Sequence, residues 1–433
     1  MRLSRTALLW CFLFLGFAFV VYSSSFEGVP IIREKHSVLG DADSANFFLL
    51  IEDFHLSKKY GDEYKIDGRS LGDNAQKHKI HHLLYAIAGS AIYKVFRVIY
   101  AVVGIDPSYA VYSVNAFLAV CNIAMLCLLL RYFGLDDPGR IVLFLAFYAF
   151  SLSTWIYASV PESWTFSATL ILLFLTLHYR FSVNPLLLSL LLGVAMLNNL
   201  FLGSLIIFLA IHFLNTSNSP SRFLIDTARS GLIMIVTWTA SLYLLSFFDS
   251  ALRPDRFIEY TFWFRDFVGY ERRWYDPYVW KILIAGLFFN PIASNQADPF
   301  MPPEALLSTL KESPLGAITL LLYLLLSVIV IFRIARLIGS KLSSTEGPMC
   351  LLKEKEIQLA CYCLTWVILT WVMYPPSGFL YSTMILPLMA LLIHGFTDME
   401  RFFHRALLYA TVAAIVLNNS VQIMSFREIL LSR

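Results

Sequence analysis

Uncharged apolar segments recur along most of the chain, and they constrain its fold more than any other feature. A helix needs about 20 apolar residues to cross a bilayer core of about 30 Å. Hydrophobic residues make up 58% of the 433 residues and charged residues only 15%, whereas soluble domains carry about 25% charged residues. The sequence therefore predicts an all-α fold, a polytopic bundle of transmembrane helices. The nearly charge-free segments include 141–158, 165–177, 231–248 and 315–332.

Clusters of Lys and Arg predict how often the chain crosses the membrane, because short cytoplasmic loops are enriched in these residues. All the clusters share one side if the chain makes about eleven crossings, the first of them an uncleaved N-terminal anchor. A cleaved signal peptide in place of this anchor is the alternative. The clusters are Arg131 with Arg140, Arg180, Arg222 with Arg229, 333–355, and Arg401 with Arg405. The predicted spans are 7–22, 110–130, 141–158, 165–178, two short helices within 185–214, 231–248, 315–332, 358–373, 379–394 and 406–423.

The segment 83–103 is predicted to lie flat on the outer membrane surface instead of crossing. Lys94 and Arg97 share one helical face with Ser90, and burying both charges in the bilayer costs roughly 5–7 kcal/mol on insertion scales. A helix in the interface keeps that face wet while its apolar face sinks into the lipid. The first outer loop then runs over 23–109.

Three parts of the chain follow from this topology. An N-terminal transmembrane module covers 1–248 and includes the first outer loop. A second outer loop covers 249–314, and its apolar piece 279–290 is predicted to be another interfacial helix because it is too short to cross. C-terminal transmembrane helices occupy 315–433.

Acidic residues of the outer segments are candidates for catalysis. Asp41 and Asp43 are two residues apart, and such carboxylates can share a proton, bind a divalent cation or act as a general base. A solvated turn or a helix cap is the alternative interpretation. Glu162 lies in Pro-Glu-Ser-Trp, at a short outer tip between two predicted spans, where a solvent-exposed cap is again the alternative.

Cationic residues of the same outer segments are candidates for binding an anionic group. Lys79, His81 and His82 precede the surface helix, and clustered amines and imidazoles suit a phosphate, although a patch that contacts lipid headgroups would look the same. Arginine binds phosphate as a planar fork, and an interfacial aromatic belt is the alternative for the second outer loop. The arginines of that loop, which stand among aromatic residues, are Arg265, Arg272 and Arg273.

The order of these motifs resembles the GT-C class of membrane glycosyltransferases, which includes protein O-mannosyltransferases and lipid A aminoarabinose transferases. An acidic motif follows the first span, a basic motif opens a surface helix, and a second acidic residue lies at the second outer tip. A hairpin of two short helices, broken by an Asn pair, comes next. The residues that carry the resemblance are Gly40-Asp41-Ala-Asp43, His81-His82-Leu-Leu-Tyr85, Pro161-Glu162-Ser-Trp164 and Asn198-Asn199.

The resemblance implies an enzyme that transfers a sugar from a polyprenyl-phosphate donor to an acceptor hydroxyl at the outer membrane face, with inversion. Asp41 would be the base and Asp43 a supporting carboxylate or metal ligand, and the two could exchange roles. Glu162 would orient the acceptor or assist. The acceptor could be a lipid, a glycan or a protein. Residues implied in substrate binding are His81, His82, Lys79, Asn198, Asn199 and one of Arg265, Arg272 and Arg273.

Location and partners follow from the same features. The bacterial inner membrane is favoured because the closest motif similarities are bacterial, and the endoplasmic reticulum is the alternative. The balance of 33 basic and 30 acidic residues argues against a nucleic-acid partner.

Two other functions fit the same sequence. A transporter or flippase of a lipid-linked sugar would need a polar track through the bundle. Asn115 and Asn122, seven residues apart on one helical face, are the only hint of such a track, and they could equally hold helices together. The second alternative is a structural subunit that keeps a transferase fold without activity.

Overall fold

The computed structural model describes residues 5–27, 29, 47, 50–52, 65–66, 69–70, 82–217, 219–247, 255, 313–343, 348–373 and 383–431. Most of the two predicted outer loops falls outside these ranges. The described part is helical, as the sequence predicts, apart from one two-stranded antiparallel ribbon within the first predicted outer loop.

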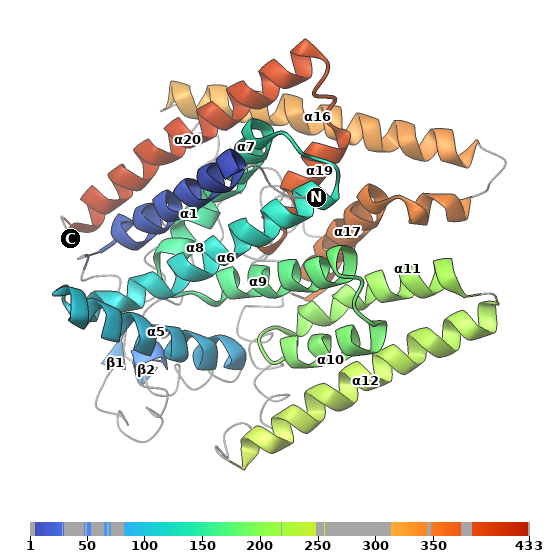
Figure 1. The fold of residues 1–433 in the computed structure, drawn as a ribbon, viewed down its shortest axis with the longest axis horizontal. Coiled ribbons are helices and arrows are strands. Elements are labelled where there is room, and N and C mark those ends of the chain that lie inside the picture. The colour runs from blue at the N-terminus through green and yellow to red at the C-terminus, as the bar shows by residue number, and fades with distance from the viewer. Residues whose placement is uncertain are drawn as a thin grey trace.

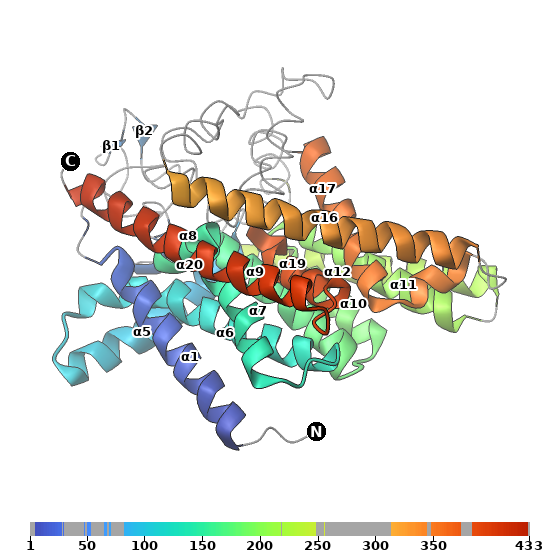
Figure 2. The ribbon, with the colours of Figure 1, turned by 90° about the horizontal axis from the view of Figure 1, so that it is seen from above.

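The elements are arranged as an irregular bundle (Figure 1), with α12 along one edge and α16 and α20 along the opposite edge. Figure 2 shows α16 and α20 side by side from a second direction. The α-helices are α1 (Arg5–Ser25), α5 (Leu83–Val103), α6 (Ala110–Tyr132), α7 (Pro138–Ala149), α8 (Leu152–Ser159), α9 (Ser163–Leu175), α10 (Pro185–Ala195), α11 (Ile206–Thr216), α12 (Pro220–Ser246), α16 (Pro314–Leu342), α17 (Lys355–Met373), α19 (Leu386–Phe396) and α20 (Phe402–Leu431). Shorter elements are the strands β1 (Lys65–Ile66) and β2 (Arg69–Ser70), the 3₁₀ turns η2 (Pro107–Tyr109), η4 (Leu200–Leu205), η6 (Pro348–Lys353) and η8 (Thr383–Ile385), and the π-helical turn η3 (Thr176–Arg180).

Large apolar side chains cover much of the exposed surface, which identifies the chain as an integral membrane protein. Soluble monomers rarely expose contiguous apolar patches of more than a few hundred Å². Within the described ranges, five helices are long and apolar enough to cross a membrane, or six if the bent pair α7–α8 is one span. The total of about eleven spans stays a prediction. Exposed apolar residues on α12 and α16 include Leu224, Leu232, Val236, Leu244, Leu321, Val328 and Phe332.

Polar caps and prolines mark where many of these helices begin. Helices α7, α10, α12 and α16 each start with proline immediately after an N-cap residue whose side chain accepts a hydrogen bond from a main-chain N–H. Proline suits this position because the first N–H groups of a helix have no partner within the helix. The N-cap residues are Asp137, Asn184, Ser219 and Ser313. Helix α12 therefore begins at Pro220, earlier than the predicted 231, and it includes the basic residues assigned to a loop.

The predicted single span 141–158 is wrong as a continuous helix, because the chain breaks between α7 and α8 and bends by 69°. The break frees the carbonyl groups of Ala149 and Phe150 inside the bundle, where each needs a new hydrogen-bond partner. The Tyr22 hydroxyl donates to the Ala149 carbonyl at 2.7 Å, and the Asn419 amide donates to the Phe150 carbonyl at 2.7 Å. Helices α1 and α20 therefore stabilise a bend that the apolar sequence of 141–158 does not reveal.

Replacing Asn419 by leucine is expected to destabilise the protein by about 1–3 kcal/mol, because the buried Phe150 carbonyl would lose its donor. Thermal unfolding in detergent would measure the loss. Tyr22→Phe, which removes the donor to the neighbouring carbonyl, should give a loss of the same sign. A melting temperature unchanged in both variants would show that the bend does not depend on these donors.

The basic segments predicted to be cytoplasmic contact one another in the structure. Arg140 lies 3.4 Å from Glu400, and both Arg333 and Arg401 pair with Asp398, at 3.3 and 3.1 Å. The segments 131–140, 333–355 and 398–405 thus meet at one end of the bundle. The side of the membrane that this end faces stays a prediction.

Helix α5 is buried in its first half and exposed in its second. Ser90 is buried, whereas Lys94 and Arg97 are exposed, so the three residues do not form one wet face. Ser90 lies in the covered half, whereas neighbouring helices contact the second half on one side only, where Phe96 stacks on Phe19 of α1 and Tyr100 bonds to Ser113 of α6. Since α5 is also long and apolar enough to cross a membrane, its position flat on the outer surface stays a prediction.

Candidate functional site

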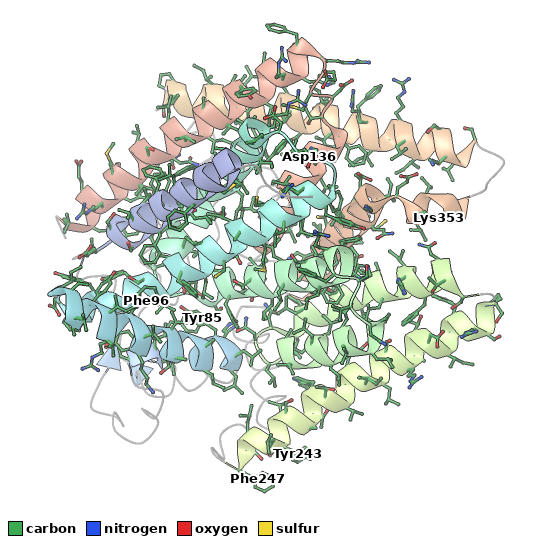
Figure 3. All side chains as sticks on the ribbon, in the orientation of Figure 1. Tyr85, Phe96, Asp136, Tyr243, Phe247 and Lys353 are labelled. Carbon is green, nitrogen blue, oxygen red and sulfur yellow. The ribbon has the colours of Figure 1, made fainter. Side chains whose placement is uncertain are left out.

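Three of the candidate site residues meet at one place although they are far apart in the sequence. His82 precedes α5, Glu162 precedes α9, and Asn198 lies in the break between α10 and η4. Figure 3 labels Tyr85, in the first turn of α5, well apart from Asp136 and Lys353. Asn115 and Arg131 lie near opposite ends of α6, roughly 24 Å apart at about 1.5 Å per residue. The site is therefore at the end of the bundle opposite the basic clusters.

The imidazole ring of His82 is held in a defined orientation by one hydrogen bond and two aromatic contacts. Its Nδ1 lies 2.9 Å from the main-chain oxygen of Asn198, and because a carbonyl only accepts hydrogen bonds, Nδ1 carries the proton. In the neutral ring, Nε2 is then the acceptor nitrogen. Edge-to-face contacts with Phe47 at 5.7 Å and Trp164 at 5.6 Å, between ring centroids, fix the plane of the imidazole.

Asn198 joins α5 to the hairpin and to α9. Its Oδ1 accepts from the main-chain N–H of Tyr85 at 3.1 Å, and its Nδ2 donates to Ser167 Oγ at 2.8 Å. The N–H of Leu83 also donates to the Leu197 carbonyl. The hairpin break therefore satisfies N–H groups at the start of α5, which has no side-chain cap of its own.

Asn199 has a local role that differs from that of its neighbour. Its side chain accepts from the main-chain N–H of Phe201 at 3.0 Å and so begins η4. The predicted hairpin, broken at the Asn pair, is confirmed by the short helices α10 and α11 on either side. The part of both asparagines in substrate binding stays a prediction.

Glu162 is almost completely buried, with 1% of its surface exposed. Its Oε1 accepts from the main-chain N–H of Ser163 at 3.0 Å, at the start of α9. A carboxylate is stabilised at a helix N-terminus by the unpaired N–H groups and by the helix dipole. Burying a carboxylate is nevertheless costly, and buried ionisable groups of membrane bundles are concentrated at functional sites.

Asn115 and Asn122, the possible polar track, hold helices together. Both Asn115 amide bonds go to main-chain carbonyls, of Tyr157 and Glu162, each at 2.8 Å. Asn122 donates to the Thr165 carbonyl at 3.1 Å and to the Tyr148 hydroxyl at 3.2 Å. Since their amide hydrogens are used within the bundle, these residues are helix contacts and not the lining of a path.

The remaining candidate residues lie outside the described ranges. They include both members of the Asp pair, so the geometry of a cation site formed by that pair is not described. Among the described residues, no group of three or more His, Cys, Asp or Glu side chains could hold a metal ion. The candidates outside the described residues are Asp41, Asp43, Lys79, His81, Arg265, Arg272 and Arg273.

Ser167 is the site residue that the sequence pattern did not reveal. It lies one helical turn after Ser163 in the largely apolar α9, and it is completely buried. A serine within a helix usually bonds to the carbonyl group four residues earlier or points to solvent. Only its contact with Asn198, 31 residues later, identifies its role.

Two solved structures are similar to this chain. No protein-family model matches it, and neither does any curated protein sequence. One structure is ArnT from Cupriavidus metallidurans bound to undecaprenyl phosphate, 14% identical over 98% of this chain and 73% of that chain, with a TM-score of 0.49. The other is ArnT from the same organism in the apo state, 13% identical over 90% of this chain and 78% of that chain, with a TM-score of 0.38. At these levels of similarity, the function has to be argued from the residues of the chain itself.

Proposed function

We propose that the chain is a membrane glycosyltransferase that moves a sugar from a polyprenyl-phosphate donor to an acceptor hydroxyl. The observation that carries the proposal is the meeting of His82, Glu162 and Asn198 at one buried polar site. These residues belong to three separate motifs of the resemblance to GT-C transferases, and the contacts among the motifs are short: 2.9 Å from His82 to Asn198, and an edge-to-face contact between His82 and Trp164.

The acidic motif of the first outer loop is within reach of this site. Phe47 is completely buried and packs on His82 and Tyr85. Asp43 precedes Phe47 by four residues, and four residues span at most about 14 Å. The chain can therefore bring the Asp pair to the imidazole and to the Glu162 tip.

The proposed reaction is a single displacement with inversion. The acceptor oxygen attacks the anomeric carbon as its proton passes to Asp41, and the bond from that carbon to the phosphate oxygen breaks. Polyprenyl phosphate leaves with the electron pair of that bond. Asp43 supports the base or holds a divalent cation, and the two aspartates could exchange these roles.

Cations and a second carboxylate complete the proposed site. His82 in its doubly protonated form, in which Nε2 also donates, would hold the phosphate together with His81 and an arginine of the second outer loop (Arg265, Arg272 or Arg273). Charge-assisted hydrogen bonds to phosphate are about twice as strong as neutral ones. Glu162 would orient the acceptor. The site would face outward, opposite the basic segments, in a bacterial inner membrane.

A transfer assay in membranes tests the proposal. Radiolabelled polyprenyl-phosphate sugars are supplied to vesicles that contain the protein and to matched vesicles that lack it. The expected result is label in an acceptor only when the protein is present. If no donor gives transfer, while labelled lipid crosses the bilayer faster in the vesicles with the protein, the chain is a flippase.

A further inference from the structure

We infer that Asn115 is a positioning residue of the transferase, which fixes the Glu162 tip and acts on the reaction through Glu162. The inference rests on the proposed function. It concerns a residue in the middle of the bundle that belongs to none of the motifs of the resemblance. Asn115 is completely buried, as is its partner Tyr85.

Both ends of the tip are attached to the same Asn115 amide. The tip joins α8 to α9, and it leaves the last carbonyl groups of α8 without helical partners. Asn115 Nδ2 donates to the Tyr157 carbonyl on the α8 side and to the Glu162 carbonyl on the α9 side, each at 2.8 Å. Thr165 also donates to the Tyr157 carbonyl at 2.8 Å. One side chain thus sets the width of the turn that presents Glu162.

The side-chain oxygen of Asn115 connects the tip to the start of α5, next to His82. Asn115 Oδ1 accepts from the Tyr85 hydroxyl at 2.7 Å. The main chain of Tyr85 donates to Asn198, and Asn198 donates to Ser167. Ser167 and Glu162 are joined by the first turn of α9.

These contacts form a closed ring that runs from Glu162 through Asn115, Tyr85, Asn198 and Ser167 and back along α9. A closed ring fixes each member from two sides, so a shift of one member has to break a bond elsewhere. Buried polar networks in which every member is bonded are rigid for this reason. His82 shares this rigidity because its Nδ1 bonds to the Asn198 carbonyl. The ring therefore fixes the distance between the cationic and the acidic parts of the site.

Asn122 provides a matched comparison within the same helix. It is equally buried, it lies on the same face of α6, and it donates to another carbonyl at the start of α9, that of Thr165. Its Oδ1 is buried without a hydrogen-bond partner in the described structure. Asn122 has no bond to Glu162, and none to Tyr85 or Asn198, so its loss should affect folding but not the placement of the tip.

The experiment compares Asn115→Leu with Asn122→Leu, each alone and combined with Glu162→Gln, in the transfer assay. Asn115→Leu is expected to lower kcat by about 100-fold with little change in the KM for the donor, because a displacement of about 1 Å at a reacting group costs this much. Asn122→Leu should change kcat by less than about threefold once both are corrected for folded protein.

The double variants separate positioning from stability. If Asn115 acts through Glu162, Asn115→Leu adds almost nothing to the loss that Glu162→Gln already causes, because coupled residues are non-additive. A merely structural residue would give additive losses, and that result would overturn the inference. If Asn115→Leu fails to fold, Tyr85→Phe replaces it. This variant removes the Tyr85–Asn115 hydrogen bond but keeps the packing of the aromatic side chain. Combined with Glu162→Gln, it should show the same non-additivity with a smaller loss of kcat.

Amide hydrogen exchange tests the inference without any reference to activity. The amides of 158–163 should exchange faster in Asn115→Leu than in wild type, whereas Asn122→Leu should leave them protected, because local opening follows the loss of local contacts. Equal exchange of this segment in the two variants would overturn the inference. Absence of transfer in wild type, with the exchange difference present, would count against the proposed function and not against the role of Asn115 in holding the tip.

Discussion

Replacing Asp41 by asparagine is expected to lower kcat for sugar transfer by about 10²–10⁴-fold, the usual contribution of a general base. Asparagine keeps the size of the side chain but cannot accept the acceptor proton, so binding of the donor should change little. The measurement is the initial rate of label transfer from a polyprenyl-phosphate sugar, in membranes with equal amounts of protein. Asp43→Asn is measured in parallel, because the two carboxylates could exchange roles, and the larger loss of kcat names the base.

A matched control and a metal titration complete this experiment. Asp106 lies in the same predicted outer loop, where its carboxylate accepts from the main-chain N–H of Ser108 and caps a 3₁₀ turn. Asp106→Asn should change kcat by no more than about twofold. If Asp43 holds a divalent cation, chelation should abolish transfer in wild type and added cation should restore it. Full activity of the Asp41→Asn, Asp43→Asn double variant would remove both residues from the mechanism.

Replacing Gly193 by alanine is expected to destabilise the protein by about 1–3 kcal/mol, the usual cost of overpacking. A Cβ at this position would lie 2.5 Å from the main-chain oxygen of Met234 and 2.7 Å from the Cβ of Thr237. Ser189, one turn earlier on the same face of α10, is completely buried, so α10 presents the small-residue pattern that lets membrane helices pack closely. Helix α12 would have to move away. Thermal unfolding in detergent measures the loss.

Gly231 offers the control for this substitution, since it is a glycine of α12 in the middle of a helix. A Cβ there would meet only Ile206 Cδ1 at 3.6 Å, an ordinary contact. Gly231→Ala should therefore be neutral or stabilising, because alanine exceeds glycine in helix propensity by about 1 kcal/mol. The steric explanation fails if the two alanine variants melt at the same temperature.

The bend between α7 and α8 could not be predicted from the sequence. The segment 141–158 is uniformly apolar, and hydrophobicity alone favours one straight span. The carbonyl groups freed by the bend are satisfied by Tyr22 and by Asn419, and the second of these contacts joins residues 269 positions apart. No local pattern in the segment records these donors, because a hydrogen-bond partner is supplied by whichever helix packs nearby.

The candidate site divides in the same way. Sequence motifs identified His82, Glu162 and the Asn pair as residues of interest, and the hairpin broken at that pair is present in the structure. The motifs did not reveal Ser167, and they left Asn115 open between a polar track and a helix contact. Only the packing of α6 against α9 showed that its amide bonds to the Glu162 carbonyl.

Taken alone, the sequence determined the class of protein, the helical nature of its segments and the positions where many of them begin. These properties depend on local hydrophobicity and on caps within a few residues, such as Asn184 before α10, which begins at the predicted residue 185. The tertiary structure decided the bend of α7–α8, the burial of Ser90 and the closed ring around Glu162. Each of these depends on contacts between residues that are distant in sequence, such as the bond between His82 and Asn198, which are 116 positions apart. Such contacts form only when the helices pack.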